Sequence, residues 1–325
     1  MKTVISTDRV AAVELLRKGE LVALPTETVY GLAANALNPI AVAKIFEAKE
    51  RPRFDPLIVH LPNRDWLGRI VDLPIGDRQL IGKLADKFWP GPFTMVLPKR
   101  QAVPDIVTAG LDTVAVRLSA HRVFAEIVGE LDEPLAAPSA NRFGRVSPTT
   151  AQHVLDELDG RIPLIVDAGP TEHGIESTIV TVRDGGIPIL RRGPITQEQL
   201  SEFAEVSSVL CTPRISSPGQ LPSHYAPKTP LRLIDNAAAF LPQKSQRVGL
   251  LAWYGKKDDL QRRSLKFAVV RSLSERQDLQ EAAGNLFREM RELDALGLDL
   301  IVAERVPSGG LGAAIMDRLQ RASHR

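Results

Sequence analysis

The chain has 325 residues, of which 44% are hydrophobic and 25% are charged, and its net charge is +2. This composition is that of a globular protein of one or two domains, and it excludes global disorder. Residues 1–205 carry 23 Lys and Arg against 27 Asp and Glu, whereas residues 206–325 carry 18 against 12. Neither part is as basic as a dedicated nucleic-acid-binding module usually is.

Cysteine content and hydropathy indicate the compartment. The single cysteine, Cys211, excludes an internal disulfide and a four-cysteine zinc site. The first ten residues, MKTVISTDRV, lack the apolar core of a signal peptide. No stretch approaches the ~18 apolar residues that a membrane-spanning helix needs. We therefore expect a cytoplasmic protein without a membrane partner.

Helices and strands alternate along residues 1–206. The spacing of Val10, Val13 and Leu16 predicts a helix over 7–18, and Pro25 ends a buried strand over 21–24. Gly185-Gly186 indicates a hairpin between strands at 177–183 and 187–191. The remaining predicted helices are 40–48, 79–88, 122–129 and 149–158, the last capped by Ser147-Pro148, and the remaining strands are 57–61, 94–98, 113–118, 135–137 and 164–167. This alternation with hairpins predicts the α/β class, with helices packed on a mixed sheet.

A proline-rich stretch separates this part from a second one. Residues 207–230 contain repeated proline and serine turns, which leave little room for a regular element and predict a linker. Beyond it, strands are predicted at 231–234, 248–252 and 300–302, and helices at 278–296 and 312–321. The predicted organisation is therefore a domain over 1–206, a linker over 207–230 and a smaller α/β domain over 231–325.

Three cations, Lys49, Arg51 and Arg53, lie within five residues at the end of a predicted helix. Cations at a helix C-terminus are favoured by the helix dipole, so a capped helix end followed by a solvated loop explains them. Converging cations on a proline-stiffened loop are also what a polyphosphate requires, and Arg binds phosphate in a forked geometry. On composition alone, the capped helix end is the favoured interpretation.

Three further groups of polar residues lie at the ends of predicted strands. They are Thr26-Glu27-Thr28, the turn Ala137-Pro138-Ser139-Ala140-Asn141 with Ser147, and Ser177-Thr178 with Arg191-Arg192. Loops at strand ends are frequent ligand sites, yet a helix cap, an ordinary turn and an exposed hairpin account for each group alone. The sequence contains no Walker-type loop, GxGxxG, zinc-ligand spacing or GxSxG motif.

Taken together and in this order, these motifs resemble the YrdC-type domain. The segments are Pro25 to Leu32, Lys49 to His60, Pro138 to Asn141 and Ser177 to Val180. Two later segments, Ser217 to Pro227 and Val306 to Leu319, resemble the long, two-domain form of the threonylcarbamoyl-AMP synthases. The resemblance implies a YrdC-type mixed twisted sheet with helices, followed by a smaller C-terminal Rossmann-like α/β domain.

The resemblance also implies a reaction. L-Threonine, bicarbonate and ATP, with Mg²⁺, would give threonylcarbamoyl-AMP and pyrophosphate. A partner threonylcarbamoyl transferase complex would then modify an adenosine beside the tRNA anticodon, and any direct contact of this chain with tRNA would be weak. The absence of a covalent-catalysis motif suits such chemistry, because phosphoryl and adenylyl transfer depend on positioning and on cations.

Matched positions carry the roles that the resemblance implies. Lys49 and Arg51 are the expected catalytic residues at the phosphates, and no protein ligand is assigned to the metal. The expected nucleotide-binding residues are Arg51, Asp55, Thr113, Ser139, Asn141, Ser147, Arg191 and Tyr225. The expected threonine-binding residues are Thr28, His60, Arg117, Ala137 and Ser177, with Arg117 suited to the threonine carboxylate. Asp55 stands where the family usually has Asn, and a carboxylate there would repel phosphate unless it bound Mg²⁺ or Arg53.

Two alternative functions fit parts of the sequence. The first is a non-catalytic RNA-binding YrdC-type module, which a steep salt dependence of RNA affinity would favour. The second is a carbamoyl transferase of the hydrogenase-maturation type, but the zinc fingers of that family are excluded by the single cysteine.

Overall fold

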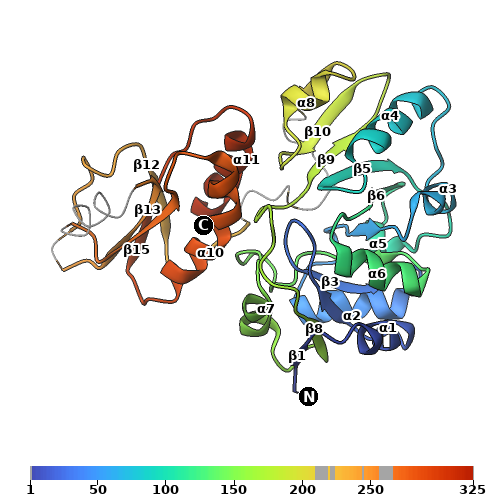
Figure 1. Ribbon diagram of the computed structural model, residues 1–325, viewed down its shortest axis with the longest axis horizontal. Helices are drawn as coiled ribbons and strands as arrows, with labels where there is room; N and C mark the ends of the chain where they lie inside the picture. The colour runs from blue at the N-terminus through green and yellow to red at the C-terminus, as the bar shows by residue number, and fades with distance from the viewer. Residues whose placement is uncertain (1, 209–218, 220–223, 244, 256–265, 325) are drawn as a thin grey trace. The chain divides into compact units, whose positions relative to one another are not determined.

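The computed structural model describes all residues except 1, 209–218, 220–223, 244, 256–265 and 325 (Figure 1). The chain forms two compact units. The N-terminal unit comprises Met1–Phe143, Pro148–Glu172 and Glu176–Gln220, and the C-terminal unit comprises Gly144–Ser147, His173–Ile175 and Leu221–Arg325. Most of the predicted linker lies outside the described residues, so its limits, and the domain limits drawn from it, stay predictions.

The N-terminal unit is built on one mixed sheet of 11 strands, in the order β1-β8-β2-β3-β7-β4-β6-β5-β9-β10-β11. It contains both parallel and antiparallel neighbours, such as β4–β6 and β5–β6 respectively. The mixed sheet confirms the predicted fold class. The strands are β1 (Val4–Ser6), β2 (Val22–Leu24), β3 (Gly31–Asn35), β4 (Ile58–His60), β5 (Phe93–Pro98), β6 (Thr113–Arg117), β7 (Leu135–Ala136), β8 (Leu164–Val166), β9 (Thr178–Thr181), β10 (Ile187–Arg191) and β11 (Val206–Ser208).

Helices cover both faces of this sheet. Neighbouring residues of a strand point to opposite faces, so each strand contributes apolar side chains to a core on either side. Val22 and Ala33 pack in a core cluster with α1 and α6, whereas Ala23 and Leu32 belong to the cluster that contains α2, α4 and α7. The helices are α1 (Arg9–Arg17), α2 (Pro39–Lys49), α3 (Leu67–Ile70), α4 (Arg78–Phe88), α5 (Asp105–Thr108), α6 (Arg122–Leu131), α7 (Ala151–Leu158) and α8 (Gln197–Ser201), with a 3-10 turn η1 (Arg64–Trp66).

Several local predictions need correction. The side chain that caps α7 is Thr150, which accepts a hydrogen bond from His153, and not Ser147-Pro148. β3 follows the Thr-rich loop, where no strand was predicted. β11 begins at Val206 and runs two residues into the stretch from 207 onward that is expected to hold no regular element, and it pairs with β10. The predicted hairpin is confirmed, because β9 and β10 are antiparallel and Arg183 pairs with Gly186 at the turn.

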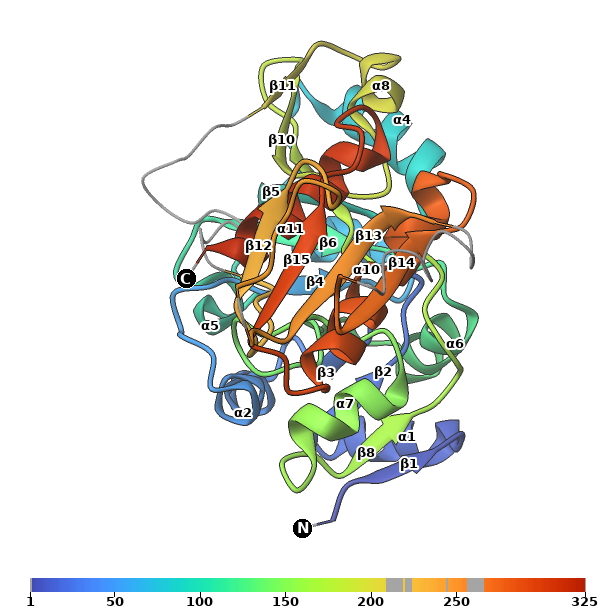
Figure 2. The ribbon, with the colours of Figure 1, turned by 90° about the vertical axis from the view of Figure 1, so that its left-hand side faces the viewer.

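The C-terminal unit has a parallel sheet of four strands in the order β12-β15-β13-β14. Figure 2 shows the four strands side by side, with helices α10 and α11 against the same face of the sheet. The strand β14 was not predicted. The elements are β12 (Leu231–Ile234), β13 (Val248–Tyr254), β14 (Val269–Ser274), α10 (Leu279–Asp294), β15 (Leu300–Glu304) and α11 (Leu311–Ser323).

None of the helices in the described part of the chain has both the length and the hydropathy needed to cross a membrane.

Candidate active site

A row of polar side chains crosses the middle of the large sheet. His60 on β4 lies beside Arg117 on β6, and Arg117 lies beside Thr94 on β5. Residues directly opposite on neighbouring strands point to the same face, so these three side chains share one face of the sheet. The hydroxyl of Ser177, just before β9, extends the row, since its Oγ is 2.8 Å from Oγ1 of Thr94. Buried polar side chains in line across a sheet need a reason other than packing.

Arg117 is held by the loop that follows β2. One terminal nitrogen lies 2.7 Å from Oε1 of Glu27, and the other donates to Oγ1 of Thr28 at 3.0 Å. Its Nε donates to the carbonyl oxygen of Gly91 at 3.3 Å. The second oxygen of Glu27 accepts a hydrogen bond from Ser119 at 2.5 Å. The guanidinium is therefore buried and fixed on three sides, which orients it before any ligand arrives.

Burial and the pairing with Arg117 shift the pKa values of Glu27 and His60. Burial raises the pKa of Glu27, but the charge of Arg117 and the hydrogen bonds from Ser119 and Arg117 outweigh burial and lower it to about 2. Burial, with the neighbouring charge of Arg117, lowers the pKa of His60 to about 3. At neutral pH the pair is therefore Glu27⁻ with Arg117⁺, and the His60 ring is uncharged.

Lys49 ends helix α2 and points into the protein. The helix begins at Asn38, whose side chain caps it by accepting hydrogen bonds from the amides of Ile40 and Ala41. This cap fixes the start of the helix. The Lys49 ammonium donates to the carbonyl oxygens of Ser139, at 2.5 Å, and Asn141. Burial, followed by repulsion from Arg51, lowers the pKa of Lys49 well below its ordinary value. The basic helix end is thus buried against the Ser-Ala-Asn turn, and the interpretation as a solvated helix cap is wrong for Lys49.

Arg51 and Asp55 form a buried ion pair directly after this helix. A terminal nitrogen of Arg51 lies 2.8 Å from Oδ2 of Asp55, and their side chains are 4% and 1% exposed. Arg51 also donates to the backbone oxygen of Pro56 at 3.0 Å. Arg53, one of the two partners considered for Asp55 from the sequence, is exposed. The partner in the structure is therefore Arg51.

Arg191 ends β10 and points back to the start of β9. Its Nε and a terminal nitrogen donate to the carbonyl oxygen of Ser177 at 3.1 and 3.0 Å, and the terminal nitrogen also lies 3.1 Å from Oγ of Ser177. Its positive charge acts on Asp55, as the charges of Lys49 and Arg51 do. Ser177 thus joins the row on the sheet to a second cluster of three buried cations around one carboxylate.

Comparisons with known proteins agree along the whole chain. The family model described as "Telomere recombination" matches residues 14–193, and the one described as "Threonylcarbamoyl-AMP synthase, C-terminal domain" matches residues 195–324. The threonylcarbamoyl-AMP synthase of Bacillus subtilis is 40% identical over 96% of this chain and 92% of its own length. That of Pyrococcus abyssi is 37% identical over 97% and 93%.

The chain belongs to the threonylcarbamoyl-AMP synthase family. Among solved structures, it resembles Sua5 of Pyrococcus abyssi complexed with L-threonine, with a TM-score of 0.86 and 35% identity, covering 99% of this chain and 98% of that one. Membership of this family of synthases favours an enzyme over a non-catalytic RNA-binding module, and it confirms the resemblance seen in the motifs.

Most of the residues expected at the site of a threonylcarbamoyl-AMP synthase converge in the N-terminal unit. Arg117, His60 and Ser177 lie in the row, Thr28 accepts a hydrogen bond from Arg117, and the Ala137 amide donates to the carbonyl of Ile58, two residues before His60. The others in this unit are Lys49, Arg51, Asp55, Ser139, Asn141 and Arg191. Thr113 starts β6, at the opposite end of that strand from Arg117, which separates the two by about 13 Å along the strand.

Ser147 and Tyr225 belong to the C-terminal unit. The backbone oxygen of Ser147 accepts a hydrogen bond from Arg291 of α10 at 3.4 Å. Tyr225 is buried with a positive φ of 63°, stacks on Phe287 at 5.5 Å and lies under the guanidinium of Arg318 at 5.1 Å. Their predicted roles at the nucleotide stay predictions.

Three residues of the site receive no predicted role from the sequence. Glu27 was noted as a carboxylate after a strand, but its partner lies 90 positions away, so no local pattern pairs it with Arg117. Thr94 is a single hydroxyl residue near the start of β5, and Ser119 is another that lies two residues after the end of β6. Only the strand register, which places Thr94 opposite Arg117, identifies Thr94.

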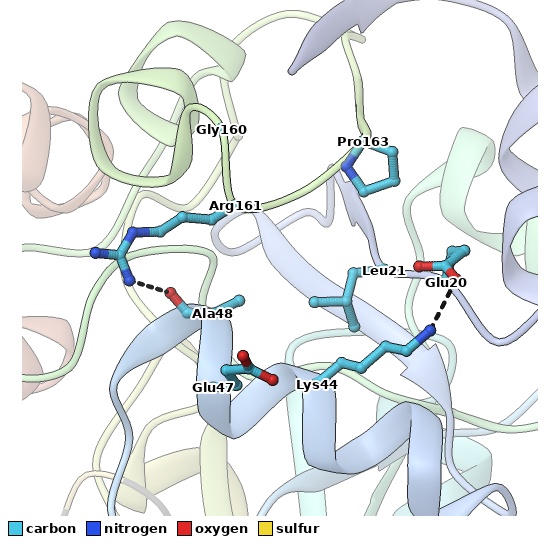
Figure 3. Close-up of a pocket in the computed structure, with 8 residues that line it drawn as sticks. All are labelled: Glu20, Leu21, Lys44, Glu47, Ala48, Gly160, Arg161 and Pro163. Atoms are coloured by element: carbon cyan, nitrogen blue, oxygen red, sulfur yellow. Dashed lines mark hydrogen bonds and ion pairs between the residues drawn. The ribbon is translucent and has the colours of Figure 1, made fainter. Parts of the chain in front are cut away.

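A pocket of about 410 Å³ lies behind helix α2 and contains none of the expected site residues (Figure 3). Its two basic side chains, Lys44 and Arg161, are engaged with neighbours. Lys44 pairs with Glu20 at 2.8 Å, and Arg161 donates to the carbonyl oxygen of Ala48 and pairs with Glu50. The contacts of Arg161 satisfy a carbonyl in the last turn of α2, which helps to fix Lys49 at the next position.

Proposed function

We propose that this protein condenses L-threonine, bicarbonate and ATP into threonylcarbamoyl-AMP and pyrophosphate. The observation that carries the proposal is the adjacency of two preorganised clusters joined at Ser177. One presents the oriented guanidinium of Arg117 beside hydroxyls, which suits the carboxylate, amine and hydroxyl of a small amino acid. The other gathers Lys49, Arg51 and Arg191, which suits a polyphosphate. Membership of the synthase family supports this assignment.

The proposed chemistry needs no protein nucleophile. The threonine amine and bicarbonate combine to a carbamate with loss of water. A carbamate oxygen then attacks the α-phosphorus of ATP, and the bond between that phosphorus and the bridging oxygen of the β-phosphate breaks to release pyrophosphate. Negative charge develops on phosphoryl oxygens, so fixed cations and orientation lower the barrier.

Individual residues serve these needs in the proposal. Arg117 binds the threonine carboxylate, with Glu27 and Thr28 fixing its orientation. Neutral His60 and the hydroxyl of Ser177 border the same substrate without adding charge. Lys49 and Arg51 stand at the phosphates, and Mg²⁺ enters with ATP as the substrate complex.

The product is a mixed anhydride, which a second enzyme has to consume. In the proposal a threonylcarbamoyl transferase complex takes it up in the cytoplasm and transfers the threonylcarbamoyl group to tRNA. Any direct contact of this chain with tRNA is weak, which suits the excess of acidic over basic residues in 1–205.

The assignment of the phosphate site is tested by pyrophosphate release from purified variants. Lys49→Ala and Arg51→Ala are expected to lower the threonine- and bicarbonate-dependent rate by about 100-fold or more, because each removes a fixed cation from the developing charge. Arg53→Ala is the matched control, since Arg53 lies two residues after Arg51 in the same basic segment but is exposed, and its rate is expected to be unchanged. Full activity in both folded site variants would refute the assignment.

A further inference from the structure

Asp55 is a carboxylate where a polyphosphate is expected to bind. Its side chain is 1% exposed, and its only ion pair among the described residues is with Arg51. Neither of its oxygens receives a well-aligned hydrogen bond from the described residues. A buried carboxylate with one ion pair and no such hydrogen bond is poorly compensated, because buried charges are usually both paired and hydrogen-bonded. This arrangement therefore needs a reason.

The charges around Asp55 supply that reason. Lys49 faces it from the end of α2, Arg51 from the loop that follows, and Arg191 from the end of β10. These cations are buried too, with 1%, 8% and 7% of each residue exposed. Without an anion among them they would repel one another in a medium of low dielectric constant. Asp55 supplies one negative charge at the place where a bound triphosphate would supply several.

We propose that Asp55 is a built-in counter-anion of the phosphate site: it pairs with Arg51 while no nucleotide is bound, and it takes up a proton when the triphosphate replaces it. This inference rests on the proposed function, because it assumes that the cluster of Lys49, Arg51 and Arg191 binds the phosphates of ATP. It makes Asp55 a residue that sets nucleotide affinity, rather than a direct ligand of the nucleotide.

The uptake of a proton by Asp55 follows from the charges around it before and after ATP binds. In the free protein, burial raises the pKa of Asp55, while the charges of Arg51, Lys49 and Arg191 oppose that rise. A triphosphate that draws these cations to itself removes the opposition and adds negative charge nearby, so the pKa of Asp55 rises further. Because the bound state then holds one more proton than the free state, ATP affinity in the wild type rises as the pH falls.

The decisive variant is Asp55→Asn, which keeps the shape of the side chain and removes its charge. Titration calorimetry with ATP and saturating Mg²⁺, without threonine or bicarbonate, measures ATP affinity. Repeating the titration in two buffers of different ionisation enthalpy measures the number of protons taken up on binding. At pH 8 the variant is expected to bind ATP about tenfold more tightly, since a neighbouring like charge is gone. The advantage is expected to shrink towards pH 6, and the variant is expected to take up fewer protons than the wild type when ATP binds.

Two controls isolate the effect. Glu289→Gln removes another largely buried carboxylate, on α10, that pairs with Arg288 at 2.9 Å and has no place in the cation cluster, so its proton uptake with ATP is expected to match the wild type. Adenosine, which carries no phosphate, is expected to bind the wild type and Asp55→Asn alike. Protonation of ATP itself is common to all the proteins and cancels in their comparison.

Distinct outcomes overturn the inference. Equal or weaker ATP binding by a folded Asp55→Asn variant, or equal proton uptake in both proteins, contradicts it. If the variant does not fold, the wild type still tests the inference. Proton uptake by the wild type that is no larger than the protonation of ATP itself would also contradict the inference. Failure of ATP to bind the wild type at all would refute the proposed function as well, whereas ATP binding without these effects refutes only the role of Asp55.

Discussion

At the scale of single residues, the site is organised by ion pairs that are almost fully buried. The side chains of Glu27 and Arg117 are 5% and 4% exposed, and each has further hydrogen-bond partners besides the other. A buried pair of this kind adds little net stability compared with an apolar pair, but breaking it is costly because one charge stays buried alone. Its value is orientation of the guanidinium.

Glu27→Gln is therefore expected to destabilise the protein. The pKa of Glu27 is lowered from 4.5 to about 2, so its ionised form contributes stability that is fully present above pH 4.5 and is lost as the pH falls towards 2. That shift corresponds to about 3 kcal/mol at pH 7. Urea unfolding at pH 7 is expected to show a loss of about this size, and the loss is expected to shrink as the pH falls from 4.5 towards 2. An equal loss at every pH would mean that packing, and not the charge of Glu27, is responsible.

The sequence predicts which of these residues lie together better than it predicts their pairings. Matched motifs predict Thr28, His60, Arg117 and Ser177, and the structure brings them together, with His60, Arg117 and Ser177 in the row and Thr28 bonded to Arg117. The pairing of Glu27 with Arg117 was missed because ion pairs between distant loops leave no periodic trace in the sequence. The partner of Asp55 was open between Mg²⁺ and Arg53, and the structure gives Arg51, four positions earlier.

At the scale of elements, the missed strands show where pattern reading fails. β3 has the sequence GLAAN, with four of its five residues buried, so it lacks both the alternation and the β-branched side chains that mark a half-buried strand. β14 alternates polar and apolar residues weakly and was overlooked between two loops. The long amphipathic helices, α1, α2, α4 and α10, were predicted to within two residues at each end, because each has a strong apolar stripe or a clear cap and stop.

Gly193 lies two residues after β10 and packs against the chain at the start of β9, and this junction allows a test of an element's role. A Cβ on Gly193 would lie within 3.0 Å of the Thr178 amide nitrogen and the Glu176 carbonyl oxygen, which are backbone atoms and cannot move cheaply. Gly193→Ala is therefore expected to push the two segments apart, to displace Ser177 from Arg191, and to cost about 1–3 kcal/mol of stability together with ATP affinity.

Gly129→Ala is the control for this substitution. Gly129 lies in α6, where an added Cβ meets nothing within 4 Å, and alanine favours a helix, so its thermal unfolding temperature is expected to be equal or slightly higher. Comparison of the two variants by thermal unfolding and ATP titration separates crowding at the hairpin from the general effect of adding a methyl group. Wild-type ATP affinity in Gly193→Ala would show that this junction does not position the site.

At the scale of the whole molecule, the two units are interleaved in the sequence. The short segments Gly144–Ser147 and His173–Ile175 come from the first part of the chain but belong to the C-terminal unit. Arg291 of α10 donates to the carbonyl oxygens of Val146 and Ser147. A Cβ on Gly174 would lie within 3.0 Å of the Ala283 carbonyl oxygen, so α10 packs closely on this segment too.

A chain that ends at Gln220 is accordingly expected to be impaired. It keeps β11 but leaves the two interleaved segments without the helix that packs on them, so Ser147 and its neighbours become exposed. We expect a lower unfolding temperature and threonine-dependent pyrophosphate release reduced by about tenfold or more, as for loss of residues that position a substrate. An unchanged rate from the shortened protein would show that the C-terminal unit is dispensable for the chemistry.

The central claim, that this chain makes threonylcarbamoyl-AMP, is tested most directly by mass spectrometry of its product. The purified protein is incubated with ATP, Mg²⁺, L-threonine and bicarbonate, and rapidly quenched samples are analysed for the adenylate. Use of ¹³C-labelled bicarbonate is expected to raise the product mass by one unit, and omission of threonine is expected to abolish the product. Release of pyrophosphate without a labelled adenylate, or no product from a folded protein that binds ATP, would contradict the account.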